Sequence, residues 1–136
     1  MKTARYLNPN IDVQRHVPIR ISLGIPKFRL PYAIAGYAGL LAPMRAMLGV
    51  TDRPTYESLY RKLLDRLGVE RIHRALRTLH TPPDREIVLL CFEDVRDPDA
   101  FCHRRIFADW WQLRTGREVL ELDEPAPKPR GKPLFE

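Results

Sequence analysis

The sequence predicts a single α/β domain with a small, mostly parallel sheet flanked by helices. Residues 16–23 alternate apolar and other side chains, as a half-buried strand does. Residues 87–92 form a continuous apolar run, which is typical of a strand buried on both faces of a parallel sheet. Helical segments separate and follow these strands, and this alternation favours right-handed crossovers in one layered domain. The length of 136 residues suits one domain, not two.

Between the two strands we expect a loop, one short helix and two long helices. Two prolines and a glycine break any period over residues 24–32, so this segment is predicted to be a surface loop. A short helix is predicted over residues 43–48. Apolar side chains at helical spacing predict helices over residues 56–67 and 69–79. The first is capped by Thr55 or Asp52 and ended by Gly68, and Thr81-Pro82-Pro83 ends the second.

After the apolar strand, Asp97-Pro98-Asp99 supplies cap residues and a proline suited to a first helical turn. We therefore expect a helix from this point to Gly116, followed by a last strand over residues 118–122. The domain is predicted to span residues 1–122. Residues 123–136 are rich in proline and charge, which predicts an extended tail.

The composition excludes several classes of protein. No apolar run approaches the roughly 20 residues of a membrane helix, and the first residues lack the apolar core of a secretory signal. We therefore expect a cytoplasmic protein with no membrane partner. Its two cysteines, Cys91 and Cys102, are too few for a disulfide scaffold and are expected to be free thiols, buried residues or ligands.

The positive charge is unevenly distributed along the chain. The formal net charge is +6, and residues 1–54 alone carry eight Lys/Arg against two Asp. Arginine is used far more than lysine, and its planar guanidinium suits phosphate and carboxylate groups. This indicates a polyanionic partner, either nucleic acid or a phosphorylated small molecule, although such a charge also serves solubility.

The densest group of chemically capable side chains follows the apolar strand. It comprises Cys91 and Glu93 at the strand end, then Cys102, His103 and Arg104. Ligands of open α/β sheets bind at the carboxyl ends of the strands, and a helix start favours anions. We therefore predict a catalytic set here, formed by Glu93, Cys102, His103 and Arg104.

Three interpretations of this set remain open. Cys102 could be a thiolate nucleophile, although neighbouring helical residues such as His103 seldom face one another. The cysteines, Glu93 and His103 could bind a metal, but they lack the paired spacing of structural zinc sites, so no metal site is predicted. Glu93 could instead act as the reactive carboxylate while His103 and Arg104 bind an anion. In that case the cysteines pack, and Glu93 could equally be a structural partner of Arg104.

Four further basic residues are predicted to bind an anion or nucleic acid: Arg20, Lys27, Arg29 and Arg105. Phe28 and Tyr32 lie among them in the loop and could stack on bases. Because strand ends and the following loops face one side of a doubly wound sheet, we expect one common cleft. The expected lining residues are Arg20, Arg29, Glu93, His103 and Arg104.

The strand ending in Cys91-Phe-Glu93, the Cys102-His-Arg104-Arg105 run and the final strand together resemble the carboxyl-terminal signature of the domain-of-unknown-function 488 family. Residues 18–22 and 26–29 are similar to that family's amino-terminal segment, without its Asp. The Trp110-Trp111 pair and the long loop before Phe101 resemble a branch found in actinobacteria and their phages. The resemblance implies a shared site and suggests a link to nucleotide or nucleic-acid processing.

Two functional hypotheses follow, and neither identifies a cofactor. An enzyme acting on a nucleotide or nucleic acid would use both the strand-end residues and the basic loop. A noncatalytic nucleic-acid-binding module would use the charge and the aromatic side chains alone. A protein-interaction module, in which the apolar helix faces and the Trp pair support a homodimer, is a further alternative.

Overall fold

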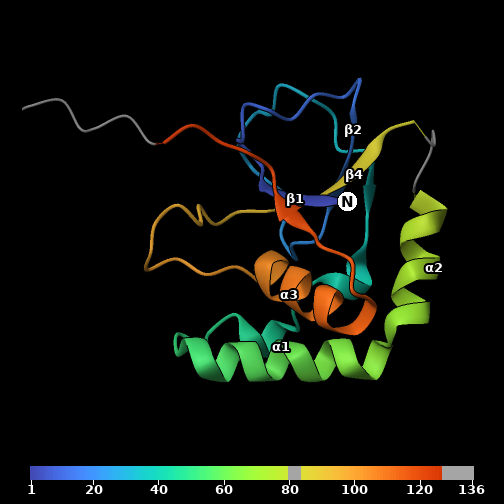
Figure 1. Ribbon diagram of the computed structural model, residues 1–136. Helices are drawn as coiled ribbons and strands as arrows, with labels where there is room; N and C mark the ends of the chain where they lie inside the picture. The colour runs from blue at the N-terminus through green and yellow to red at the C-terminus, as the bar shows by residue number, and fades with distance from the viewer. Residues whose placement is uncertain (80–83, 127–136) are drawn as a thin grey trace, which may run out of the picture.

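The computed structural model describes residues 1–79 and 84–126 and contains one five-stranded sheet (Figure 1). The strands are β1 (Lys2–Arg5), β2 (His16–Arg20), β3 (Gly36–Tyr37), β4 (Glu86–Cys91) and β5 (Leu120–Glu121). Their order is β3-β2-β4-β1-β5, and every neighbouring pair is parallel. The predicted α/β fold is confirmed, with a sheet that is entirely parallel.

The described residues form three α-helices: α1 (Arg53–Leu67), α2 (Val69–Leu79) and α3 (His103–Thr115). Asp52 caps α1, where its Oδ2 accepts a hydrogen bond from the Thr55 backbone N–H at 3.1 Å. Gly68 ends α1 with a φ of 78°, a conformation that glycine adopts without steric cost. The helix expected over residues 43–48 is a single 3-10 turn, η2 (Arg45–Met47), preceded by a second one, η1 (Gly39–Leu41).

The two faces of the sheet are covered differently. In β4, Ile87 and Leu89 belong to the larger core, which all three α-helices complete. Val88 and Leu90 point to the other face, where a smaller core is completed by loop residues such as Tyr32 and not by a helix. Figure 1 shows α1 and α3 beneath the strands, α2 at their side and the loops above. The α-helices of the described residues therefore flank one face only, which differs from the expected doubly wound arrangement.

Two strands were not predicted from the sequence. β1 is an inner strand between β4 and β5, yet it is short and contains the small residues Thr3 and Ala4 instead of an apolar run. Thr3 Oγ1 donates to Glu121 at 2.7 Å and accepts from Arg105 at 2.8 Å, so polar contacts replace apolar ones at this position. β3 has only two residues, too few for a period to be visible.

Helix α3 starts later than predicted. Residues 97–99 form turns, in which the Asp97 carbonyl accepts from Ala100 N–H at 3.1 Å. The N-cap is Cys102, and α3 begins at His103. Cys102, His103 and Arg104 therefore lie at the buried entry of the helix and not one turn inside it.

The beginning of the predicted tail packs on the domain. Glu124 Oε1 accepts from Arg5 Nε at 2.7 Å, and the Asp123 carbonyl accepts from Asn10. Residues 127–136 and the predicted helix stop at Thr81-Pro82-Pro83 lie outside the described residues. Among the described residues, no helix is both long and apolar enough to cross a bilayer.

Candidate functional site

The carboxyl ends of the parallel strands meet at one edge of the sheet, which we call the carboxyl edge. Arg20, at the end of β2, is in register with Leu90, and Arg5, at the end of β1, with Cys91. Glu93 follows β4 by two residues. The prediction that Arg20 and Glu93 lie at the same edge is confirmed.

Behind this edge, the two cysteines are covalently joined. Cys91 and Cys102 are 0% and 3% exposed and form a disulfide that links the end of β4 to the start of α3. Of the alternatives expected for the two cysteines, that of free thiols is therefore wrong, because the 92–101 loop returns the chain to the strand that it left. Cys102 can act as a nucleophile only after reduction. The prediction that Cys91 is buried is confirmed.

His103 is also buried, and its tautomer is fixed by its neighbours. Its Nε2 lies 2.8 Å from the Ile21 carbonyl, and its Nδ1 lies 3.7 Å from Cys102 Sγ. A carbonyl oxygen only accepts hydrogen bonds, so Nε2 carries the proton and Nδ1 presents its lone pair to the sulfur. Burial lowers the pKa of His103 to about 4, and the nearby Arg104 acts in the same direction.

Arg104 lies in the interior instead of lining a cleft. Its side chain is 0% exposed, and its guanidinium donates to both carboxylate oxygens of Glu121, at 2.7 and 3.0 Å. A third donor, Nη1, lies 3.1 Å from Cys91 Sγ. The common cleft predicted for Arg104 and His103 is therefore wrong, since the core encloses both.

Arg105, predicted to bind an anion, contacts the protein itself. Its Nη1 donates to Thr3 Oγ1 at 2.8 Å and to the Val119 carbonyl at 3.0 Å. Arg105 therefore joins α3 to β1 and to the residue that precedes β5.

The outer layer of the carboxyl edge is aromatic and basic. Phe28 and Phe92 are 44% and 42% exposed, and their ring centroids lie 6.3 Å apart. Both rings rest on the buried ring of Tyr6, at 6.5 and 4.9 Å. Lys27 and Arg29 flank Phe28, are exposed and form no ion pair with a described residue.

Arg20 extends this surface toward β3. Its guanidinium lies 3.6 Å from the centre of the exposed Tyr37 ring. It also donates to the Ser22 and Leu23 carbonyls, at 3.2 and 2.9 Å. Arg20 is thus held in place with a cation–π contact, and its side chain remains half-buried.

Glu93 is an exposed acidic residue at this edge. It has no hydrogen bond or ion pair with a described residue, and its charge helps to raise the pKa values of Tyr6 and Tyr56 after the larger effect of their burial. Arg104 pairs with Glu121. The structural alternative, in which Glu93 pairs with Arg104, is therefore wrong.

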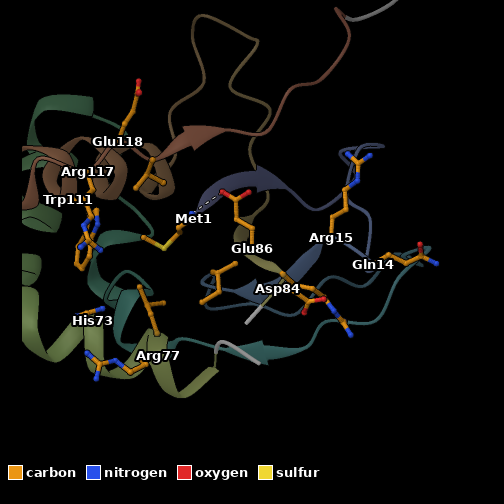
Figure 2. A pocket seen from close by; sticks show the side chains of 14 residues that line it. Met1, Gln14, Arg15, His73, Arg77, Asp84, Glu86, Trp111, Arg117 and Glu118 are labelled. Atoms are coloured by element: carbon orange, nitrogen blue, oxygen red, sulfur yellow. Dashed lines mark hydrogen bonds and ion pairs between the residues drawn. The ribbon is translucent and has the colours of Figure 1, made fainter. Parts of the chain in front are cut away.

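A cavity of about 670 Å³ lies at the opposite edge of the sheet, where the strands begin. Figure 2 shows Met1 and Glu86 in it, with the Met1 amine 2.9 Å from the Glu86 carboxylate. Arg77, Arg117 and Glu118 also line it, so both signs of charge are mixed there. A smaller cavity of about 180 Å³ lies at the carboxyl side and is lined in part by Cys102 and Phe101.

Sequence reasoning missed two aromatic residues of the carboxyl edge, Tyr37 and Phe92. The signal for Phe92 was present, because it is the first residue after the buried part of an apolar run and next to Glu93. Nothing in the sequence placed Tyr37 beside Arg20, since β3 was not predicted.

Comparisons with protein-family models, with curated proteins and with solved structures found no match to this chain. The resemblance to the domain-of-unknown-function 488 family therefore stays a prediction from the sequence.

Proposed function

We propose that this protein binds single-stranded nucleic acid at the carboxyl edge of its sheet. The observation that carries the proposal is the pair of exposed rings, Phe28 and Phe92, next to the exposed cations Lys27 and Arg29, which form no ion pair with a described residue. Aromatic faces stack on bases while basic side chains follow the phosphates, which is how single strands are bound without sequence preference.

The rings are fixed in position before any ligand arrives. Phe28 and Phe92 rest on Tyr6, and the loop that carries Phe28 is fastened by Tyr32, whose hydroxyl donates to the Tyr6 carbonyl at 2.6 Å. A fixed platform loses little conformational entropy on binding. The loop that carries Phe28 belongs to residues 1–54, which carry the excess positive charge of the chain.

We favour nucleic-acid binding over an enzymatic reaction because of the residues that lie behind Phe28 and Phe92. The predicted catalytic residues His103 and Arg104 are buried and engaged with protein groups, and Cys102 is bonded to Cys91. Of that set, Glu93 alone faces solvent. An enzymatic role would therefore depend on Glu93, which makes this residue the one that separates the two hypotheses.

The test is a salt titration of binding to a fluorescent single-stranded oligonucleotide. Each lost phosphate contact should reduce the slope of log affinity against log salt by about one unit, so Lys27→Ala/Arg29→Ala should lower it by about two. Lys62→Ala/Arg66→Ala removes the same charges from the exposed side of α1 and should leave the slope unchanged. An unchanged slope in Lys27→Ala/Arg29→Ala would show that this loop does not contact the phosphates of the oligonucleotide.

Substitution of the aromatic residues tests the platform independently of charge. Phe92→Ala should weaken oligonucleotide binding about tenfold, since base stacking contributes roughly 1–3 kcal/mol. Equal affinity for a mononucleotide and an oligonucleotide would instead indicate a small phosphorylated ligand.

Glu93→Gln distinguishes a binding module from an enzyme. In a binding module, loss of the carboxylate beside Phe92 should strengthen binding, because one repulsion of phosphate is removed. In an enzyme, the same change should abolish turnover of the oligonucleotide while affinity is kept. Cleavage assays and binding isotherms on the same preparations separate the two results.

A further inference from the structure

Three potential metal ligands converge behind the carboxyl edge. Cys91, Cys102 and His103 are all buried, and each offers one ligand atom within 4.8 Å of the other two. They come from the last residue of β4, the N-cap of α3 and its first residue. The packing of the sheet against α3 therefore brings these ligands together. Their spacing along the chain does not form a short metal-binding motif.

We propose that, once the Cys91–Cys102 disulfide is reduced, the two thiolates and His103 Nδ1 bind one Zn²⁺ ion. Zinc prefers sulfur and imidazole nitrogen ligands in a tetrahedral arrangement. This inference does not rest on nucleic-acid binding. It revises the sequence-based prediction of no metal site, which considered spacing along the chain and not the approach of β4 to α3.

The orientation of His103 is that of a metal ligand. Its Nε2–H donates to the Ile21 carbonyl at 2.8 Å, which leaves the Nδ1 lone pair directed toward Cys102 Sγ at 3.7 Å. Histidines that bind metals are commonly oriented in this way, by a backbone carbonyl at the nitrogen that does not bind the metal. The contact with the Tyr60 ring, whose centroid is 5.5 Å away, holds the imidazole plane.

Arg104 and Glu121 provide the surroundings that a thiolate needs. Arg104 Nη1 lies 3.1 Å from Cys91 Sγ, so the guanidinium can donate to a deprotonated sulfur in the interior. Glu121 neutralises the guanidinium. Two thiolates then balance the charge of one Zn²⁺, and the buried cluster has no net charge.

The cysteine backbones are spaced widely enough for a metal between them. Their Cα atoms are 7.4 Å apart, beyond the roughly 4.4–6.8 Å usual for a disulfide. Cys102 is also one of the residues that line the cavity of about 180 Å³ at the carboxyl side. Three protein ligands leave a fourth position of a tetrahedral zinc site for water.

The chemistry requires a reductant and releases two protons. A small dithiol reduces the disulfide by exchange, so that the dithiol becomes a cyclic disulfide and Cys91 and Cys102 become thiols. Zn²⁺ then displaces one proton from each thiol to form two Zn–S bonds, while the neutral Nδ1 donates its lone pair without losing a proton.

The test uses the full chain, reduced with a dithiol, freed of the reductant without oxygen and titrated with Zn²⁺ in competition with a chromophoric chelator. We expect one zinc per chain. X-ray absorption of the zinc-loaded wild type should show two sulfur ligands at about 2.3 Å and one imidazole nitrogen at about 2.0–2.1 Å. Cys102→Ser should bind zinc at least 100-fold more weakly, whereas His73→Asn, on the exposed side of α2, should match the wild type.

Two results would overturn the proposal. One is a reduced wild type that keeps its far-ultraviolet circular dichroism but retains no zinc. The other is a zinc spectrum with nitrogen and oxygen ligands only, which would indicate surface histidines. The absorption measurement uses the wild type alone, so it decides the question even if Cys102→Ser does not fold.

Discussion

Arg104 is a buried cation at the junction of α3, β4 and β5. A charge in the interior is tolerated only when its hydrogen bonds are satisfied, and Arg104 has two donors on Glu121 and one on the Cys91 sulfur. The partners are unequal, because the Arg104 side chain is 0% exposed whereas that of Glu121 is 25% exposed. Loss of the Glu121 carboxylate therefore leaves the buried Arg104 charge without a counter-charge and without water.

This difference in exposure predicts which of two substitutions reduces the free energy of unfolding more. Glu121→Gln should reduce the free energy of unfolding by about 3 kcal/mol, since it leaves the buried guanidinium without a counter-charge. Arg104→Met should cost less, because the remaining Glu121 carboxylate is partly hydrated and methionine fills much of the space. Urea denaturation of both variants at neutral pH measures the order. A larger loss in Arg104→Met would show that packing of the arginine stem matters more than its charge.

The sequence drew attention to the residues around Arg104, but their contacts differ from those expected. His103 and Arg104, which were expected to line a cleft, are both buried at the start of α3. An arginine pair in a sequence nevertheless suggests a surface for anions. The internal partners of Arg104 and Arg105 could not be predicted, because their positions depend on a sheet order in which the unpredicted strand β1 lies between β4 and β5.

At the scale of elements, segments with an apolar pattern of their own were predicted, whereas β1 and β3 were not. The predictions of α1, α2 and β4 are confirmed because each element carries its own apolar pattern over 15, 11 and 6 residues. β1 and β3 have four and two residues, and their pairing with neighbours makes them strands. The predicted start of α3 was wrong because Asp and Pro residues are favoured in turns as well as at helix N-termini, and Asp97-Pro98-Asp99 forms turns.

The cap of α1 gives an element-scale prediction. Asp52 accepts from the Thr55 N–H at 3.1 Å, so Asp52→Ala leaves that donor without its partner. The free energy of unfolding should fall by about 1 kcal/mol, whereas Asp52→Asn, which keeps an acceptor, should cost only a fraction of that. Thermal and urea unfolding followed by circular dichroism provide the comparison. Equal losses in the two variants would assign the effect to the charge of Asp52 and not to its hydrogen bond.

At the scale of the whole molecule, the sheet is protected unevenly. Helices and a continuous apolar core cover one face, whereas the other face is covered by loops that polar contacts help to hold in place. Tyr32 fastens one loop to Tyr6, and His16 fastens the loop before β2, since its Nδ1 accepts from the Asp12 N–H at 3.0 Å. A change of pH acts directly on one of these loop contacts, that of His16.

His16 predicts the direction of that pH effect. Burial lowers its pKa below the ordinary value of about 6.5; Lys2 and Arg15 act in the same direction, while Glu86 and Asp12 oppose it. As the pH falls below about 6.5, the unfolded chain takes up a proton at His16 that the folded protein resists, so the free energy of unfolding must decrease. His16→Asn keeps an acceptor for Asp12 but cannot titrate. Urea unfolding between pH 7.5 and 5 should therefore show a shallower loss of stability in His16→Asn than in the wild type. His103 contributes equally to both proteins, so the difference between the two curves belongs to His16, and parallel curves would contradict its role.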